Sequence, residues 1–296
     1  MLCSELMKRD VERCRDSSSV AEAALSMRDH NVGFLPVSTE DEAAIGTITD
    51  RDIALRLVAE GRDPASTRVG EIMTREIISC SPNDDLAVAE ERMSRHRRSR
   101  ILCTDKSKRI AGVISLSAIA KRLPRGPAGT IAAAVAARES AAGEKLPRMR
   151  ARSAHCREIM KTDVEPCRAN DSAKHIAEIM RRRNVGFVPV CDESGAVVGA
   201  VTDRDLVLRV VAAARDPEKT SAADIMTHEV VSCSPDDPLS VVEDLMAKHK
   251  KSRIVCVDES RRPVGVVSLA DIARVERFRR VARVLRDVAS RPPRAA

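Results

Sequence analysis

The stretch that decides the fold reads GTITDRD at residues 46–52 and returns as GAVTDRD at residues 199–205. Each copy contains the end of a short apolar strand, a threonine, and two aspartates on either side of an arginine. A helical pattern of apolar residues follows each copy. The copies lie 153 residues apart, and the remainder of the chain either repeats at this spacing or connects the repeats.

Further motifs repeat at the offset of 153 residues without a gap. EIMT at residues 71–74, for example, matches DIMT at residues 224–227. A weaker repeat with an offset of 66 lies inside each half, as Met7 and Met73 show. Because such self-similarity indicates a repeat architecture, we divide the chain into repeated units and connecting segments. The divisions are four units at 1–58, 68–122, 154–211 and 221–275, an Ala-rich basic linker at 123–152, and a basic C-terminal helix or tail at 276–296.

The first unit shows the local structure that all four units share. Apolar residues recur at helical spacing between residues 20 and 27, and this pattern predicts a helix with one buried face. Strands are expected at 34–37 and 45–49, and a second helix at 52–58. One such unit cannot cover its own sheet. We therefore expect units to pack in pairs, sheet against sheet.

Composition limits the class of protein and its partners. The chain has 296 residues, is 43% apolar with only three phenylalanines, and carries a formal charge of +7. The excess charge lies in the linker and the tail, which lack aromatic residues arranged for base stacking, so we expect no nucleic-acid partner. The N-terminus has no signal-peptide pattern, and no apolar run is long enough to span a membrane. We expect a cytoplasmic protein whose nine cysteines stay reduced and which has no membrane partner.

The order and size of these units, with Met-Thr near the start, an apolar-Pro-Val strand and Gly-x-x-Thr/Ser-x-x-Asp near the end, resemble CBS domains. Two tandem units look like a Bateman module. The resemblance implies an α/β (α+β) fold of four β-α-β-β-α units, packed as two modules with pseudo-twofold symmetry. It also implies regulatory binding of an adenosyl compound rather than catalysis. No catalytic motif is recognisable in the chain, so we expect that it is not an enzyme.

The Thr-x-x-Asp pattern that ends each repeat has two readings. It is a helix capping box, in which a hydroxyl and a carboxylate satisfy two free backbone N–H groups. The carboxylate also suits a ribose diol, and the resemblance places the family's ribose-binding residues on this pattern. The implied ribose-binding residues are Thr49, Asp52, Thr202, Asp205, Ser268 and Asp271. Unit 2 departs from the pattern, because Ala118 stands where the acid belongs, and we expect its cleft to be empty or weak.

Four arginines are candidates for phosphate binding. Arg51 and Arg204 lie inside the repeated motif, where each is either a surface arginine paired with acidic neighbours or a phosphate contact. The resemblance also assigns phosphate to the basic residue before the first long strand, which is Arg100 in unit 2 and Arg253 in unit 4.

Units 1 and 3 carry a phenylalanine where units 2 and 4 carry these arginines, so each pair of units offers one aromatic and one basic edge. This suits an adenine at one end and phosphates at the other, although both phenylalanines can equally be core residues. The candidate base-contacting residues are Gly33, Phe34, Pro36, Gly186, Phe187 and Pro189.

The cysteines repeat with the units. Cys14, Cys80, Cys167 and Cys233 occupy one equivalent position in all four units. Packing of a small apolar side chain at a tight strand position is the favoured interpretation, and we assign no metal site. A metal or redox site, with His96 or His249 assisting, is the alternative.

Together these features predict a non-catalytic regulatory protein that binds an adenine nucleotide (AMP, ADP or ATP) between units. We recognise no effector domain in the sequence and expect the signal to reach an unknown effector protein in trans. The two modules would form a disc, either within one chain or in a homodimer. The alternatives are a cysteine-based redox or metal sensor and a ligand-free structural assembly module.

Overall fold

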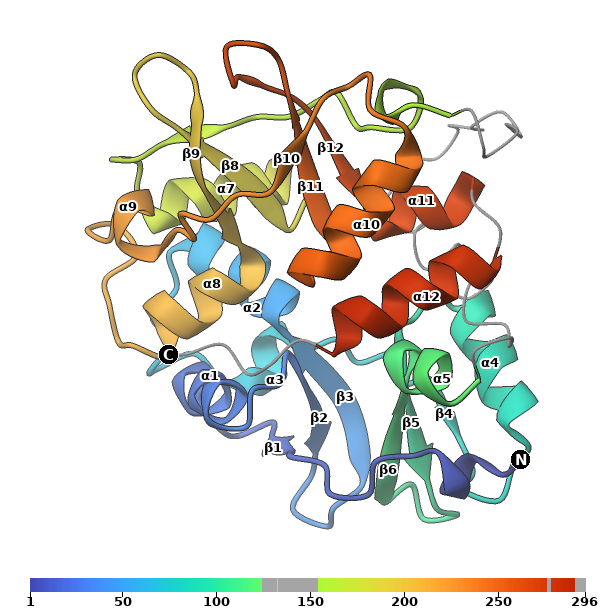
Figure 1. The fold of residues 1–296 in the computed structure, drawn as a ribbon. Helices are drawn as coiled ribbons and strands as arrows, with labels where there is room; N and C mark the ends of the chain where they lie inside the picture. The colour runs from blue at the N-terminus through green and yellow to red at the C-terminus, as the bar shows by residue number, and fades with distance from the viewer. Residues whose placement is uncertain (124–131, 133–153, 276–277, 291–296) are drawn as a thin grey trace.

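The structure, a computed structural model, describes residues 1–123, 132, 154–275 and 278–290. These residues form four three-stranded sheets with helices packed beside them, so the α/β fold expected from the sequence is confirmed (Figure 1). Of the expected linker at 123–152, only residues 123 and 132 are among the described residues. Of the expected tail at 276–296, residues 278–290 are described, apart from the side chains of residues 278, 279 and 289.

Unit 1 shows the β-α-β-β-α order. Its elements are η1 (Cys3–Glu5), β1 (Cys14–Arg15), α1 (Val20–Asp29), β2 (Phe34–Ser38), β3 (Ala44–Thr49), α2 (Asp50–Arg56) and η2 (Val58–Glu60). The middle strand β2 pairs in parallel with β1 and antiparallel with β3. Helix α1 begins at a capping box formed by Ser19 and Glu22. The second helix starts at Asp50, two residues earlier than the sequence predicts, because Thr49 is its N-cap residue.

The other units repeat this order. Unit 2 contains α3 (Val69–Ile72), β4 (Ser79–Cys80), α4 (Leu86–Arg95), β5 (Arg100–Thr104), β6 (Ile110–Ser115) and α5 (Leu116–Arg122). Unit 3 contains η3 (Cys156–Glu158), β7 (Cys167–Arg168), α7 (Ala173–Arg182), β8 (Phe187–Cys191), β9 (Val197–Thr202), α8 (Asp203–Leu206) and η4 (Val207–Val211). Unit 4 contains α9 (Ala222–Ile225), β10 (Ser232–Cys233), α10 (Leu239–His249), β11 (Arg253–Val257), β12 (Pro263–Ser268) and α11 (Leu269–Val275), and α12 (Phe278–Ala289) follows it.

The repeated methionines and glycines hold units together in pairs. The segment that leads into unit 2 crosses to unit 1, so that a Cβ on Gly46 would lie 2.8 Å from the Sδ of Met73. The segment that leads into unit 1 crosses to unit 2, and a Cβ on Gly112 would lie 2.9 Å from the Sδ of Met7. Each glycine therefore leaves room for a methionine of its partner unit. Units 3 and 4 repeat the arrangement with Gly199 and Met226 and with Gly265 and Met160.

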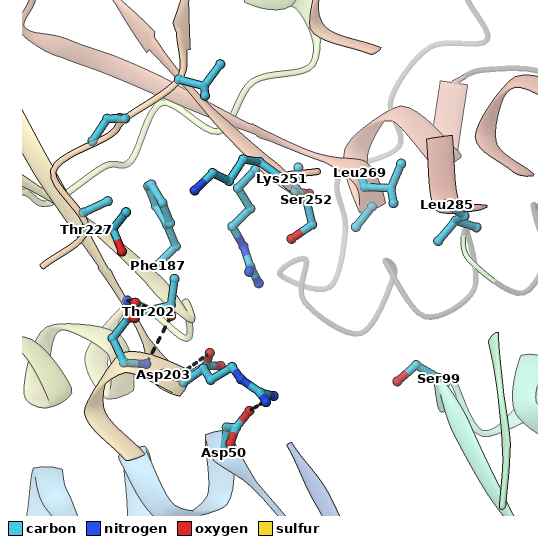
Figure 2. A pocket seen from close by; sticks show the side chains of 18 of the residues that line it. Asp50, Ser99, Phe187, Thr202, Asp203, Thr227, Lys251, Ser252, Leu269 and Leu285 are labelled. Atoms are coloured by element: carbon cyan, nitrogen blue, oxygen red, sulfur yellow. Dashed lines mark hydrogen bonds and ion pairs between the residues drawn. The ribbon is translucent and has the colours of Figure 1, made fainter. Parts of the chain in front are cut away.

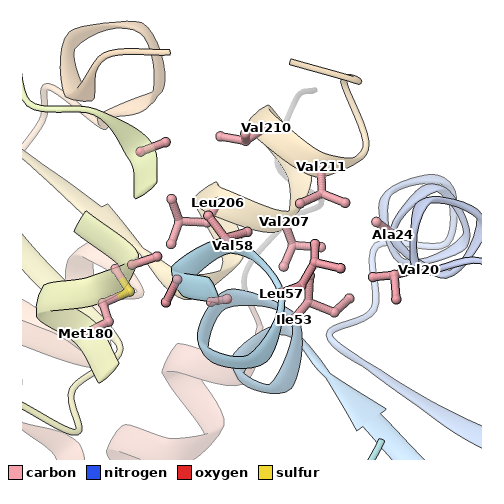
Figure 3. Packing of buried hydrophobic residues seen from close by; sticks show 14 of the residues in the cluster. Val20, Ala24, Ile53, Leu57, Val58, Met180, Leu206, Val207, Val210 and Val211 are labelled. Atoms are coloured by element: carbon pink, nitrogen blue, oxygen red, sulfur yellow. The ribbon is translucent and has the colours of Figure 1, made fainter. Parts of the chain in front are cut away.

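The two largest cores join the two halves of the chain. In the first, Ile53 and Leu57 of unit 1 lie in one buried cluster with Leu206 and Val207 of unit 3 (Figure 3). The second core joins units 2 and 4 in the same way. Each fully buried aliphatic side chain contributes about 1.5–3 kcal/mol, so these contacts fasten module 1 (units 1 and 2) to module 2 (units 3 and 4) within one chain.

Sheet-to-sheet packing inside a module, which we expect from the sequence, accounts for a smaller part of the burial. Between units 3 and 4 it is a cluster of Cys191, Val197 and Val255. The reason is that one face of each sheet is covered by helices of its own unit, and those helices present their remaining apolar residues to the opposite module.

The C-terminal helix docks on its own chain. Val281 and Val284 of α12 are fully buried in the core that joins units 2 and 4. The helix lies against α10 and α11 of unit 4 and α5 of unit 2 (Figure 1). The Arg283 side chain of this helix is half exposed and pairs with Asp244 at 3.0 Å. The amphipathic pattern of this segment therefore serves contacts between the modules.

Candidate functional site between the units

Three cavities lie beside the ends of the strands that carry the repeated motif. Cavity A, of about 540 Å³, lies between units 3 and 4 and reaches module 1; its lining includes Phe187, Thr202 and Asp205. Cavity B, of about 220 Å³, lies between units 1 and 2 beside Phe34 and Thr49. Cavity C, of about 60 Å³, lies beside Ser268 and Asp271. Each of the three complete Thr/Ser-x-x-Asp motifs thus borders at least one cavity, and Ser268 lines both A and C.

The candidate residues for ribose, base and phosphate converge in cavity A. Thr202 and Asp205 come from the end of β9 and the start of α8, and Phe187 comes from the first residue of β8. Arg253, the first residue of β11, lines the same cavity. Figure 2 shows Phe187 and Thr202 on one side of the opening, with Asp50 of module 1 below it. The lining combines an apolar ring with hydroxyl, carboxylate and guanidinium groups.

The Thr-x-x-Asp motifs form capping boxes in the structure. The Thr202 hydroxyl donates to Oδ2 of Asp205 at 2.6 Å and accepts the Asp205 N–H at 3.3 Å. The same Oδ2 accepts the Thr202 N–H at 2.9 Å. Thr49 with Asp52, and Ser268 with Asp271, repeat this geometry. Each carboxylate is therefore held in one orientation by the start of the helix that it caps.

The two TDRD motifs differ in how their second aspartate is used. Oδ1 of Asp52 accepts the Thr74 hydroxyl at 3.1 Å and lies 3.1 Å from the guanidinium of Arg56, whereas Oδ1 of Asp205 lies 3.5 Å from the equivalent Arg209. Asp52 does not line cavity B, although Thr49 does. Asp205 does line cavity A, and so does Thr227, the counterpart of Thr74. Of the two TDRD motifs, only that of unit 3 thus brings both its threonine and its second aspartate to the wall of a cavity.

The arginines inside the motifs cross between modules. Arg51 of unit 1 donates to the side chain of Asn184 in unit 3 at 2.7 Å. Arg204 of unit 3 donates to Asn31 of unit 1 at 2.8 Å and pairs with Asp50 at 3.4 Å. The sequence did not indicate this role, because it depends on how the modules dock. Both arginines also line a cavity, Arg51 in cavity B and Arg204 in cavity A.

The strand-start arginines lie beside the phenylalanines, as the alternation of aromatic and basic edges suggests. The guanidinium of Arg100 lies 5.5 Å from the centre of the Phe34 ring, within the range of a cation–π contact. Arg100 lines both cavity A and cavity B. Arg253 and Phe187 both line cavities A and C. Each of these four side chains therefore reaches at least one cavity.

The glycines and prolines have a different environment from the one we expected. A Cβ on Gly33 would lie 2.1 Å from Oδ2 of Asp50, and one on Gly186 would lie 2.5 Å from Oδ2 of Asp203. The space above each glycine is filled by a carboxylate of its own unit, although Gly186 still borders cavity C. Pro36 and Pro189 lie inside β2 and β8 and border none of the three cavities.

Asp50 is a site residue that the sequence did not single out. It lies at the boundary between the modules, its side chain is 14% exposed, and its Oδ1 is buried without a hydrogen-bond partner. Burial raises the pKa of Asp50 to about 7, although the Arg204 guanidinium acts in the opposite direction. The signal was present as the first aspartate of TDRD, but its burial depends on the opposite module.

The cavities differ in charge. Cavity B is lined by four arginines and one glutamate, so its lining has a formal excess of three positive charges: Arg51, Arg97, Arg98 and Arg100 against Glu76. Cavity A is lined by equal numbers of basic and acidic side chains: Arg100, Arg204, Lys251 and Arg253 with Asp50, Asp203, Asp205 and Glu229. A basic lining favours an anionic group, whereas the mixed lining of cavity A suits a ligand with both neutral polar and anionic parts.

Unit 2 keeps its cap without the acid. The Ser115 hydroxyl accepts the Ala118 N–H at 3.1 Å and bonds the Ser117 hydroxyl at 2.8 Å. Helix α5 is therefore started by a serine alone. This end of the unit offers no carboxylate in place of Asp52 or Asp205.

Within the described ranges, no helix is long and apolar enough to cross a membrane.

Comparison with known proteins places the chain among proteins of the same architecture. CBS domain-containing protein YhcV of Bacillus subtilis is 37% identical over 116 residues, which cover 39% of this chain and 81% of that protein. Uncharacterized protein MJ1225 of Methanocaldococcus jannaschii is 26% identical over 203 residues, which cover 69% of this chain and 68% of that protein.

The crystal structure of MJ1225, described as a putative archaeal homolog of g-AMPK, has the same fold with a TM-score of 0.63 at 16% identity. The alignment covers 92% of this chain and 99% of that chain. The family profile of the CBS domain matches four segments of this chain, at residues 3–59, 69–125, 156–212 and 222–277. Since these segments make up most of its length, the chain belongs to the CBS domain family.

Proposed function

We propose that the protein is a regulatory sensor that binds an adenine nucleotide (AMP, ADP or ATP) in cavity A, with its ribose on Asp205. The observation that carries this proposal is the convergence of Thr202, Asp205, Phe187 and Arg253 on one cavity of about 540 Å³. This volume lies within the range of small-molecule sites, which is about 300–1,000 Å³. Proteins with CBS domains are generally regulatory rather than catalytic, which agrees with this role.

Each part of the nucleotide has a group in the lining. The Asp205 carboxylate is already oriented by the helix cap through Oδ2, and its Oδ1, which lies 3.5 Å from Arg209, can accept a hydrogen bond from a ribose diol. Phe187 offers an apolar face for the base, and the guanidinium groups of Arg253, Arg204 and Arg100 surround the space for phosphate. The other proposed contacts, in cavity B at Thr49 and Arg51 and in cavity C at Ser268 and Asp271, are weaker sites for the same class of ligand.

A signal requires that the ligand bind two arrangements of the modules with different affinity. Cavity A contains Asp50 and Arg100 of module 1 as well as residues of module 2, so a ligand there contacts both modules. Such a ligand can bias their docking, and with it the surface offered to an effector protein in the cytoplasm. No catalytic step is part of this proposal.

Titration calorimetry with AMP, ADP, ATP, NAD, S-adenosylmethionine and cyclic di-AMP tests the proposal. We expect at least one of these ligands to bind below millimolar concentration. The variant Asp205→Asn should then weaken binding about 10–100-fold, because a charged hydrogen bond contributes about 1.5–3 kcal/mol. Asp224→Asn is the matched control, since Asp224 caps α9 in the same way with Ser221 but borders none of the three cavities.

The control variant should bind as the wild-type protein does. If no ligand of the panel binds below millimolar concentration, the nucleotide proposal fails and a structural assembly module is the better account. Equal weakening by Asp205→Asn and Asp224→Asn would show that the motif acts only as a helix cap.

A further inference from the structure

Three cysteine side chains from separate segments meet in the core of unit 4. Cys156 begins η3, Cys233 ends β10, and Cys256 lies in β11. The Sγ of Cys233 lies 3.9 Å from that of Cys156 and 3.5 Å from that of Cys256. Among the residues that the structure describes, these are the one group of three or more Cys, His, Asp or Glu side chains whose ligand atoms all lie within 4.8 Å of one another.

The fold brings these sulfurs together through two specific contacts. Cys233 and Cys256 are direct partners in the parallel pair of β10 and β11, so their side chains point to the same face of the sheet. Cys156 is fixed beside them because its N–H donates to the carbonyl of Asp237 at 3.0 Å, in the turn that follows β10. Cys156, Cys233 and Cys256 match Cys3, Cys80 and Cys103 at the offset of 153, but the repeat does not show that the three side chains meet in space.

The separations fit coordination to a single metal ion. A zinc–thiolate bond is about 2.3 Å long, so two sulfurs of a tetrahedral site lie about 3.8 Å apart. The observed distances of 3.5 and 3.9 Å bracket this value. All three residues are buried, with relative exposures of 0%, 6% and 0%, so a bound ion would be shielded from competing ligands in water.

We propose that Cys156, Cys233 and Cys256 bind one thiophilic metal ion, either Zn²⁺ or Cu(I). Thiolates are the preferred ligands of both ions. Three thiolates supply three of the four ligands of tetrahedral zinc, or a complete trigonal set for Cu(I). Each thiol releases its proton to solvent as its sulfur bonds the metal, so binding weakens as pH falls. This site is separate from the cavities between the units and does not depend on the nucleotide.

The site would fasten the start of module 2 to its last sheet. Cys156 lies in the segment that precedes unit 3, whereas Cys233 and Cys256 belong to unit 4. A metal ion there joins the two units of module 2 across a separation of 77 residues in sequence. Because the folded arrangement would bind the ion more tightly than the unfolded chain does, binding raises the stability of the module.

The first half of the chain contains a matched comparison. Cys80 contacts Cys3 at 3.7 Å and Cys103 at 3.6 Å, at the positions equivalent to the trio of unit 4. In this first-half trio, the three sulfur atoms do not all lie within 4.8 Å of one another. It therefore provides a set of buried cysteines with similar packing and a poorer metal geometry.

The test uses the full chain without a histidine tag, reduced and freed of metal. The protein is loaded with Zn²⁺ or with Cu(I) in separate experiments, desalted, and its bound metal is counted by mass spectrometry. We expect the wild-type protein to retain one of the two ions. The variant Cys156→Ser/Cys233→Ser/Cys256→Ser should lose about one ion per chain, whereas Cys3→Ser/Cys80→Ser/Cys103→Ser should still hold the ion of the unit 4 trio.

Titration of the wild-type protein with Co²⁺ gives a second readout that needs no variant. A thiolate-to-cobalt charge-transfer band that Zn²⁺ abolishes is expected, together with a melting temperature that rises with Zn²⁺ and falls with a chelator. The proposal is overturned if the wild-type chain retains neither ion and shows no such band. It is also overturned if a folded variant lacking the unit 4 trio retains as much metal as the wild-type protein.

Discussion

Cavities A and B begin from the same seven-residue motif and yet differ in size, charge and the use of the second aspartate. Cavity A is more than twice as large as cavity B and has a balanced charge, whereas cavity B is basic. Both second aspartates pair with the arginine four residues later, but Asp205 lines cavity A, whereas Asp52 accepts the Thr74 hydroxyl and does not line cavity B. Repetition thus preserves the helix cap and leaves the ligand role free to differ between units.

The docking of the modules adds to this difference. Asp50 and Asp203, the first aspartates of the two motifs, both line cavity A, and neither lines cavity B. The acid that balances the charge of cavity A therefore comes partly from the opposite module. The comparison teaches that the lining of a cavity between units is set by contacts between modules as well as by the motif itself.

The largest expected effect follows from neutralising Asp50. Burial raises its pKa from an ordinary 3.8 to about 7, so the folded protein holds a proton there that the unfolded chain has lost above about pH 4. This group therefore favours folding at low pH, and its contribution is lost as pH rises toward 7. Asp50→Asn should raise the free energy of unfolding at pH 8 by about 2–4 kcal/mol, with the gain shrinking toward pH 4.

Urea denaturation of both proteins at pH 5 and pH 8 measures this difference. The surrounding charges are Arg204, Asp203, Arg100 and Asp205, and the variant keeps all four. Asp224→Asn serves as control. Hydrogen bonds from Ser221 lower the pKa of Asp224, so this carboxylate is ionised at both pH values. The control should therefore leave the difference in unfolding free energy between pH 5 and pH 8 unchanged. A variant of Asp50 that is less stable than the wild-type protein at pH 8 would show that its charge is compensated.

The next effect compares the two second aspartates directly. Asp205→Asn should weaken nucleotide affinity about 10–100-fold, whereas Asp52→Asn should weaken it less than about threefold. Asp52 does not line cavity B, and Thr74 and Arg56 already occupy its Oδ1. Calorimetry under identical conditions measures both. Equal losses of affinity in the two variants would remove the distinction between cavities A and B.

The smallest effect concerns the motif that lacks its acid. Ala118→Asp should complete the capping box with Ser115, whose hydroxyl already accepts the N–H of residue 118. We expect the free energy of unfolding to rise by about 0.5–1 kcal/mol, measured by thermal and urea unfolding. Ala118→Asn, of similar size without the charge, should give a smaller gain. A loss of stability in Ala118→Asp would mean that unit 2 cannot accept the cap of the other units.

Much of the fold could be predicted because it is repeated. Glycine, methionine and the Thr-x-x-Asp cap recur in register, and each copy supports the same local structure, so the units, their strands and their capped helices followed from the sequence. The family's function followed in its general form only. The contacts of each copy were harder to predict, because similar motifs lie beside different neighbouring residues.

The missing part concerns contacts between elements distant in sequence. Arg51 and Arg204 bind asparagines of the opposite module, a contact that has no local signature. The cysteines of the unit 4 trio repeat Cys3, Cys80 and Cys103 at the offset of 153, but the sequence does not show that Cys156 meets Cys233 and Cys256 in space. Such features depend on docking, which the local pattern does not specify.

The most direct test of the central claim is a crystal structure of the full chain with the tightest-binding nucleotide of the calorimetric panel. The account predicts that the nucleotide lies in cavity A, with its ribose hydroxyls within hydrogen-bond distance of the Asp205 carboxylate and its phosphates toward Arg253, Arg204 or Arg100. A nucleotide bound elsewhere in the chain, or bound in cavity A with its ribose away from Asp205, would contradict it.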